Sequence, residues 1–160
     1  MKKTVFVFLA AVLLLCSCTS SFTVNVAEAG PAMADATEYD WMEYDKDSIY
    51  NDTGISEDMY VNCFFAWLLE ASVGNCACVA VFEAADGTKA QEIETYLKAY
   101  LTDVQLTQEN YNADNYAMSK AAELYVEGNY VVFAIAPDTS VIKNAFENAK
   151  VVKSKPGMAI

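Results

Sequence analysis

Strand-like patterns of hydrophobic residues begin at residue 59 of the chain. Residues 59–69 form a dense apolar run, and residues 76–84 are apolar at almost every position, as expected for a strand covered on both faces. The sequence Ser-Val-Gly-Asn at 72–75 lies between these runs and is typical of a turn. We therefore predict two neighbouring strands joined by a short connection.

Two later segments have the spacing of amphipathic helices. Thr88 and Gln91 form a capping box, and apolar residues recur at helical spacing after it. Asp138 follows Pro137 and is a suitable cap for a second helix. The two predicted apolar stripes are Ala90, Ile93, Leu97, Tyr100, Leu101 and Val104, and then Val141, Ile142, Ala145, Phe146 and Ala149.

A hairpin is predicted between these two helices. Residues 108–115 are polar and indicate a connector. Apolar residues alternate over 118–126 and favour a strand, although the alanines in this segment are also good helix formers. Gly128 and Asn129 then form a turn before the apolar run at 130–136.

Together these patterns predict an α+β fold. We expect an antiparallel sheet of about four strands in the order hairpin, helix, hairpin, helix, with both helices on one face of the sheet. Phe82, Val132 and Ile135 are expected on neighbouring strands that face the helices. A short N-terminal helix around residues 43–51 should dock through the aromatic residues interspersed there.

The first residues have the features of an exported protein. A pair of lysines precedes an apolar segment of about a dozen residues, which is too short to span a bilayer as a helix. The sequence that follows resembles the bacterial lipobox. Cys18 fits the lipidated position because Ser17 precedes it and Leu15 stands three residues before it, whereas Cys16 fits poorly. An ordinary secretory signal is the alternative.

The chain is expected to divide into four parts. Residues 1–17 form the lipoprotein signal peptide, and residues 18–38 form a flexible acidic tether. Residues 39–150 form a single α+β domain, and residues 151–160 form a C-terminal tail. The tether is predicted because its segment is small, polar and acidic, without a sustained apolar period.

Composition excludes several classes of function. The chain has 22 acidic residues, 10 lysines and no histidine, for a net charge of −12. Without an imidazole there is no Ser-His-Asp or Cys-His nucleophile system, and such an acidic chain repels nucleic acid. The glycines are scattered singly, and the acids around Asp45 and Asp47 lack the spacing of an EF-hand. We expect no cofactor, no metal and no nucleic-acid partner.

Three cysteines lie beyond the lipobox: Cys63, Cys76 and Cys78. They permit one disulfide at most, with a thiol left over. Cys76 and Cys78 point to the same side of a strand and are poorly placed to bond each other. Cys63 with Cys76 or Cys78 is the plausible disulfide if the first two strands are neighbours. Directly opposed pairing about residues 72 and 73 would instead place Cys63 near Phe82, which argues against that bond. Buried free thiols, a disulfide, and a metal or redox site stay open as alternatives.

Aromatic residues offer two candidate platforms for a sugar or a peptide. Packing within a helix explains the spacing of Tyr96 and Tyr100 more simply. The two groups are Tyr39, Trp41, Tyr44, Tyr50 and Tyr60, and then Tyr96, Tyr100, Tyr111 and Tyr116.

The organisation resembles a family of uncharacterised bacterial lipoproteins that contain the domain of unknown function DUF4358. The similar stretches are Val-Phe-Glu-Ala at 81–84 with its helix through Tyr100, the Asn- and Tyr-rich segment 111–116, and the segment 127–138, in addition to the lipobox. The resemblance implies a membrane-tethered extracytoplasmic domain, mostly from Gram-positive bacteria, and transfers no functional residue. The cysteines at 76 and 78 depart from the family, which is usually poor in cysteine.

Two hypotheses for function follow. The first is a non-enzymatic domain of the cell envelope, lipid-anchored through Cys18 on the extracytoplasmic face of the cell membrane, that binds a protein, a peptide or a small ligand. The second is an envelope enzyme that uses carboxylate or cysteine chemistry in a cleft beside the sheet. A deep pocket with a desolvated carboxylate or an exposed cysteine would favour the enzyme, and a shallow surface would favour the binding domain.

Overall fold

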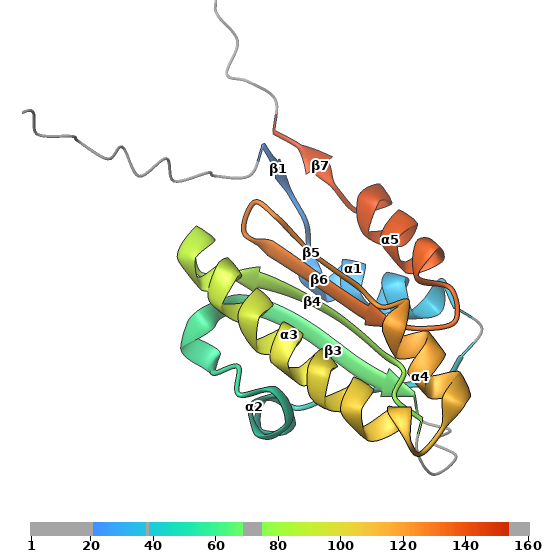
Figure 1. Ribbon diagram of the computed structural model, residues 1–160. Coiled ribbons are helices and arrows are strands. Elements are labelled where there is room, and N and C mark those ends of the chain that lie inside the picture. Colours follow the sequence, from blue (N-terminus) through green and yellow to red (C-terminus); the bar gives the residue numbers. More distant parts are fainter. Residues whose placement is uncertain (1–20, 38, 69–74, 154–160) are drawn as a thin grey trace, which may run out of the picture.

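The computed structural model describes residues 21–37, 39–68 and 75–153. Its centre is a five-stranded antiparallel sheet in the order β2-β3-β4-β6-β5 (Figure 1). These strands are β2 (Trp41–Glu43), β3 (Tyr60–Leu68), β4 (Cys78–Ala84), β5 (Glu123–Glu127) and β6 (Tyr130–Ile135). A separate two-stranded antiparallel ribbon pairs β1 (Phe22–Thr23) with β7 (Val151–Val152).

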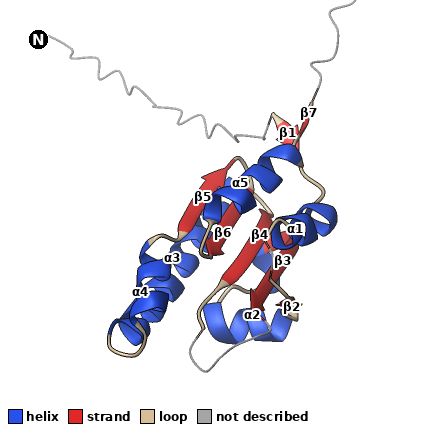
Figure 2. Cartoon of the chain, turned by 90° about the vertical axis from the view of Figure 1, so that its right-hand side faces the viewer, coloured by secondary structure: helices blue, strands red, loops and turns tan. Residues whose placement is uncertain are grey.

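Helices cover both faces of the sheet (Figure 2). On one face lie α1 (Val26–Asp35) and α5 (Thr139–Asn148). On the other lie α2 (Lys46–Thr53), the 3-10 turn η1 (Glu57–Met59), α3 (Gly87–Glu109) and α4 (Ala113–Lys120). The predicted α+β class is confirmed. The prediction of about four strands with both long helices on one face is wrong, because α3 and α5 lie on opposite faces of a five-stranded sheet.

The two central strands explain why helices are needed on both faces. In β4, Val79 and Val81 are buried on the face that α1 and α5 cover, whereas Ala80 and Phe82 are buried on the α3 face. Strand β6 alternates in the same way. Burial of a valine contributes about 1.5–3 kcal/mol. If both helices lay on one face, the valines on the other face would stay exposed and this stabilisation would be lost. The prediction that β4 is covered on both faces therefore conflicts with the prediction that both helices lie on one face.

The predicted hairpin is confirmed at its turn. Glu127 of β5 pairs with Tyr130 of β6, and Gly128 takes a positive φ of 62°. On its other side β6 pairs with β4, so that Phe82 stands opposite Val131. The residues predicted on neighbouring strands, Phe82, Val132 and Ile135, do lie on β4 and β6.

The segment before this hairpin differs from the prediction. Residues 118–122, predicted as the start of a strand, include the end of helix α4, and β5 begins only at Glu123. The reason is local: the side chain of Asn112 accepts hydrogen bonds from the backbone N–H groups of Asp114 and Asn115, which starts a helix inside the predicted connector.

The two predicted long helices are present. Helix α5 is capped by Asp138, whose carboxylate accepts a hydrogen bond from the N–H of Ser140. Helix α3 is capped by Asp86 rather than by Thr88, and it continues to Glu109. Asp86 accepts from two backbone N–H groups, those of Thr88 and Lys89, and so starts the helix before the predicted capping box.

The aromatic segment that precedes β3, residues 44–53, packs on the α3 face of the sheet. The short helix predicted around residues 43–51 is present as α2, capped by Asp45. Ile49 of this helix is fully buried, and the ring of Tyr44 stacks on Phe65 at a centroid distance of 5.2 Å. Strand β2, which was not predicted, precedes the helix and pairs with the end of β3.

The predicted flexible tether at residues 18–38 is wrong for its described part. Helix α1 buries a stripe at i, i+3, i+4, i+7 and i+8 against β3, β4 and α5. The stripe escaped detection because most of its members are small and a proline follows its glycine. Its residues are Val26, Ala29, Gly30, Met33 and Ala34. Residues 1–17, the predicted signal peptide, lie outside the described residues.

Gly30 lets α1 approach the sheet closely. A Cβ atom at this position would lie 2.2 Å from Cγ and 2.3 Å from Cβ of Phe64 on β3. Such separations are far below van der Waals contact, and the Cβ of Phe64 belongs to a covered strand that cannot swing aside. The glycine is therefore a requirement of the helix–sheet contact, although glycine weakens a helix intrinsically.

Replacing Gly30 by alanine should lower the free energy of unfolding by about 1–3 kcal/mol, the usual cost of overpacking. Chemical denaturation of the variant measures this loss. The matched control is Gly87→Ala at the start of α3, where a new Cβ meets no atom within 4 Å. The control should be neutral or slightly stabilising. Equal stability of the two variants would contradict the close approach.

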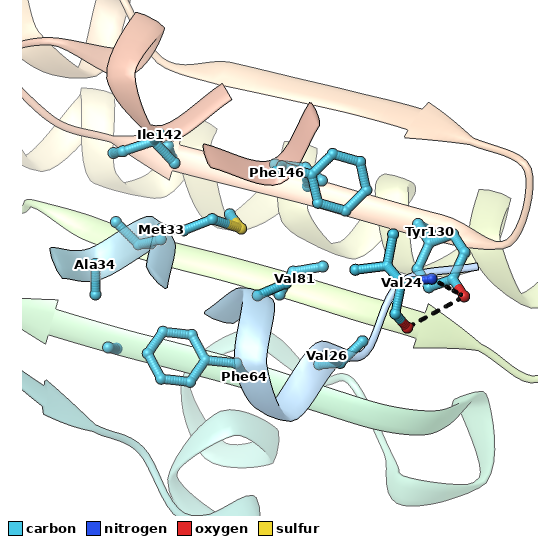
Figure 3. Packing of buried hydrophobic residues seen from close by; sticks show 14 of the residues in the cluster. Val24, Val26, Met33, Ala34, Phe64, Val81, Tyr130, Ile142 and Phe146 are labelled. Carbon is cyan, nitrogen blue, oxygen red and sulfur yellow. Dashed lines mark hydrogen bonds between the residues drawn. The ribbon is translucent and has the colours of Figure 1, made fainter. Parts of the chain in front are cut away.

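The ends of the described chain meet in the β1–β7 ribbon. The C-terminal tail predicted from residue 151 is wrong for Val151 and Val152, which pair with Thr23 and Phe22. The ribbon is fixed to the sheet through Tyr130, whose hydroxyl accepts from the N–H of Val24 at 3.0 Å and donates to its carbonyl (Figure 3). The ring of Phe22 stacks on that of Tyr130 at 5.5 Å.

Candidate functional site

A pocket of about 490 Å³ opens at the end of the sheet where β3 and β6 finish and β4 begins. Four of its lining residues are alanines, whose small side chains leave the cavity open, and Leu68 and Met118 form apolar walls. The side chains of Tyr39, Asn75 and Asp114 bring polar groups to it. The lining residues are Tyr39, Leu68, Asn75, Ala77, Asp114, Asn115, Ala117, Met118, Ala121, Ala136 and Pro137.

Helix α4 forms one wall of this pocket and is held by hydrogen bonds from its inner side. The side-chain amide of the buried Asn115 donates to Oε1 of Gln108 at the end of α3, at 3.3 Å. The amide of Gln105 donates to the carbonyl of Ser119 at 3.0 Å. The thiol of Cys76, just before β4, donates to the carbonyl of Asn115 at 3.5 Å. These bonds tie α4 to both α3 and the sheet, so the wall is preorganised.

The three cysteines are free thiols in the structure. Cys63 on β3 stands opposite Phe82 on β4. This is the strand register that argues against a disulfide from Cys63. Cys78 is fully buried among the residues of the α3 face, and Cys76 packs against the same cluster. Burial raises the pKa of all three thiols, so they stay protonated near neutral pH, and a thiol is a poor nucleophile compared with a thiolate.

A second, more polar pocket of about 400 Å³ lies beside the first and shares Asn75 with it. It brings Asp52 from α2 and Asp103 from α3 to the same cavity as Cys76 and Tyr100. Burial raises the pKa of the Tyr100 phenol, which therefore acts as a neutral hydrogen-bonding group near neutral pH. Of the two pockets, this one holds carboxylates together with a cysteine, the groups that the enzyme hypothesis requires.

Three carboxyl groups in the described residues have a clearly shifted pKa, and each shift is downward. Asp45 accepts from the backbone N–H of Ser48, and Asp138 accepts from the hydroxyl and N–H of Ser140. Asp58 accepts from the hydroxyl of a neighbouring serine. Such hydrogen bonds favour the ionised form, whereas a general acid needs a raised pKa. None of the three lines either pocket.

The two aromatic platforms are not assembled. In the first group, Tyr60 is buried, Tyr44 is stacked on Phe65, and Tyr50 is exposed on α2; Tyr39 alone lines the apolar pocket. In the second, Tyr100 packs edge-on against Phe133, in agreement with helix packing as the simpler explanation.

The pocket itself was not predicted from the sequence. Its walls come from separate segments, and its space is created by alanines, which carry no chemical signature. One usable signal was present: Pro137 directly follows the apolar run of β6, and a proline there ends a buried strand at the rim of a sheet. Cys18 lies outside the described residues.

No helix among the described residues combines the length and apolar character that crossing a bilayer requires. In comparisons with known proteins, the family model described as "Domain of unknown function (DUF4358)" matches residues 34–136. This stretch includes the five-stranded sheet with α2, α3 and α4, and every residue that lines the apolar pocket except Pro137. Comparisons with the curated proteins and with the solved structures gave no match.

Proposed function

The chain belongs to the DUF4358 family, and we propose that it is a lipid-anchored binding domain on the extracytoplasmic face of the cell membrane. In this proposal Cys18 carries the lipid, and the apolar pocket beside α4 holds an apolar group of a protein or peptide partner. The observation that carries the binding part is the pocket: a mostly apolar cavity with a few amide and carboxylate groups around it is the usual form of a ligand site.

The chemistry of the site supports binding rather than catalysis. The rival hypothesis, an envelope enzyme, would use Asp52, Asp103 and Cys76 in the polar pocket. The raised pKa of the Cys76 thiol disfavours the thiolate that cysteine chemistry requires. Its proton is also engaged, because the thiol donates to the carbonyl of Asn115. The pocket that is richer in apolar groups is therefore the better candidate site.

The lipobox supports the anchor. Leu15, Ser17 and Cys18 fit the three characteristic positions, and an attached diacyl or triacyl group gives the two-chain attachment that stable membrane residence needs. The chain has a net charge of −12, so an anionic membrane surface would repel it without such an anchor.

The anchor is tested by metabolic labelling with a fatty acid. Cys18→Ala should abolish the label, because the modified sulfur is removed. Cys16→Ala should keep it, because Leu15, Ser17 and Cys18 are unchanged. A label that persists in the Cys18 variant would overturn the assignment of the lipidated residue.

The pocket is tested by filling it. Ala117 is exposed on α4 and lines the pocket, so Ala117→Trp should occupy the cavity without disturbing the buried core. The matched control is Ala113→Trp, at an exposed position of the same helix that does not line the pocket. Cross-linked capture from the native envelope should lose a partner with Ala117→Trp and retain it with Ala113→Trp. Equal capture by both variants would remove the pocket from the proposal.

A further inference from the structure

The β1–β7 ribbon lies at one end of the fold and joins the first and the last strand of the described residues (Figure 1). It is built from Phe22 and Thr23 on one strand and Val151 and Val152 on the other, and the N–H of Lys153 donates to the carbonyl of Ser21 at 2.9 Å. Phe22 turns inward onto Tyr130. The ribbon is therefore attached to the fold by one side chain of β1, while β7 forms its outer strand.

Two adjacent apolar side chains on β7 are turned to solvent. Val151 is 67% exposed and Val152 is 77% exposed, the two largest fractions among the exposed large hydrophobic side chains of the described residues. Other exposed apolar residues, such as Val61 and Leu106, stand singly on other elements. Successive strand residues point to opposite sides, so the two valines present apolar surface on both sides of a narrow ribbon.

The charge around the ribbon differs from that of the rest of the chain. Residues 150–160 contain three lysines and no acidic residue, in a protein with 22 acids. Within the described part, Lys150 pairs with Glu127 and Glu147 and offsets part of their negative charge. An apolar strand in a sequence segment that carries lysines and no acidic residue is suited to a lipid headgroup layer.

The distance to the proposed anchor is short. Only three residues separate Cys18 from Phe22. A fully extended chain advances at most about 3.6 Å per residue, so Phe22 lies within roughly 15 Å of Cys18, the residue proposed to carry the lipid. The headgroup region on each side of a bilayer is several ångströms deep, so β1 has no freedom to leave the vicinity of the membrane surface.

We propose that the β1–β7 ribbon lies in the headgroup layer of the membrane that holds the anchor, with Val151 and Val152 inserted among the lipids. The inference rests on the proposed lipidation of Cys18 and adds a second membrane contact and a fixed orientation to it. Two contacts, a lipid and a ribbon, restrict rotation of the domain in a way that a lipid on a flexible tether does not.

The orientation decides where the apolar pocket points. Strand β6 begins at Tyr130, which contacts the ribbon residue Phe22, and it ends next to Ala136, which lines the pocket. Strand residues advance about 3.3 Å each, so the ribbon and the pocket are separated by roughly 20 Å along β6. Both views of the fold place the ribbon and helix α4 at opposite ends (Figures 1 and 2). The pocket therefore faces away from the membrane and is open to partners in the cell envelope.

The ribbon contact is tested with a chain that starts at Cys18 and is ligated to a diacyl phospholipid bearing a thioester. The Cys18 thiol displaces the leaving thiol of the thioester, and the acyl group then moves to the N-terminal amine, so that an amide bond joins lipid and chain. The lipidated chain is inserted into phosphatidylcholine–phosphatidylglycerol vesicles with brominated acyl chains. Val152→Trp should place an indole among the lipids, and the emission that it adds to that of the parent protein should fall about twofold against vesicles without bromine. The control is Tyr111→Trp in the turn between α3 and α4, where the side chain is 65% exposed, and its added emission should not change.

Equal quenching of the two variants, or quenching of neither, overturns the ribbon contact. Circular dichroism verifies that both variants are folded, and the high exposure of both positions favours this. Because the lipid is attached chemically, this result does not depend on natural lipidation. Failure of the fatty-acid labelling overturns the proposed anchor, whereas failure of the quenching in the chemically anchored chain overturns the ribbon contact alone.

Discussion

A chain that begins at Glu38 is expected to lose its cooperative unfolding transition or to aggregate. It lacks β1 and α1, and it therefore loses the cover that α1 shares with α5 over one face of the sheet. Val26 and Met33 on α1 are almost completely buried, as is Val24 before it. At about 1.5–3 kcal/mol for each such side chain, the loss removes a large part of the roughly 5–15 kcal/mol that stabilises a typical domain.

The loss has a second component on the other side of the interface. Without α1, the side chains of Phe64 and Val81 become exposed on a face that is otherwise apolar. A large exposed apolar patch promotes aggregation. Thermal unfolding followed by circular dichroism, together with light scattering, measures both effects. The control is a chain that begins at Thr19, which keeps every described residue and should melt like the mature protein. Equal melting of the two chains would show that α1 is not part of the folded core.

The substitution Phe82→Ala is expected to lower the free energy of unfolding by about 3–5 kcal/mol, the usual range for a fully buried phenylalanine. Phe82 is 0% exposed at the centre of the α3 face. Its ring meets the rings of Tyr60 at 5.5 Å and Phe65 at 6.4 Å, both in edge arrangements. Removing it opens a cavity between β3, β4 and α3 that these flat neighbours cannot fill without leaving their own contacts.

Urea or guanidinium unfolding measures the loss. The matched control is Val61→Ala on the neighbouring strand β3, where the side chain is 65% exposed. Its effect should stay within about 0.5 kcal/mol, because an exposed side chain contributes little burial. A loss below about 1 kcal/mol for Phe82→Ala would contradict the packing of α3 on this face.

The parts of the fold that could be predicted are those built from large apolar side chains. Strands β4 and β6 and helix α5 bury valine, isoleucine and phenylalanine at regular spacing, and this spacing is visible in the sequence. Helix α1 follows the same rule with alanine and glycine in most of the buried positions. Its composition resembled a linker because close packing against Phe64 requires small residues, and small residues give a weak hydrophobic signal.

The side of the sheet on which each helix packs could not be derived from the two helices taken separately. It follows from the strands: because β4 and β6 are apolar on both faces, the sheet requires two covers. The pattern of β4 already contained this information. Weighing it against the proposed repeat of hairpin and helix would have placed α3 and α5 on opposite faces.

The site was less accessible to prediction than the fold. The cysteines drew attention by their chemistry, yet burial keeps them protonated. The pocket depends instead on where Ala77, Ala117 and Ala136 meet at the end of the sheet. That meeting is set by the register of β4 and β6 and by the cap of α4 at Asn112, neither of which has a chemical motif.

The pairing of β1 with β7 has a consequence for the order in which the fold forms. The chain emerges from its N-terminus, so α1 appears before the five-stranded sheet, but its contacts on α5 and the partner of Phe22 at Val152 appear only after that sheet. The β5–β6 hairpin and the α3–α4 pair are local and close rapidly once they emerge. Closure of the face under α1 joins the most distant parts of the sequence and carries the largest loop entropy. It is therefore expected to be the slow step of folding, during which the part of the α1 stripe that packs on α5 stays uncovered.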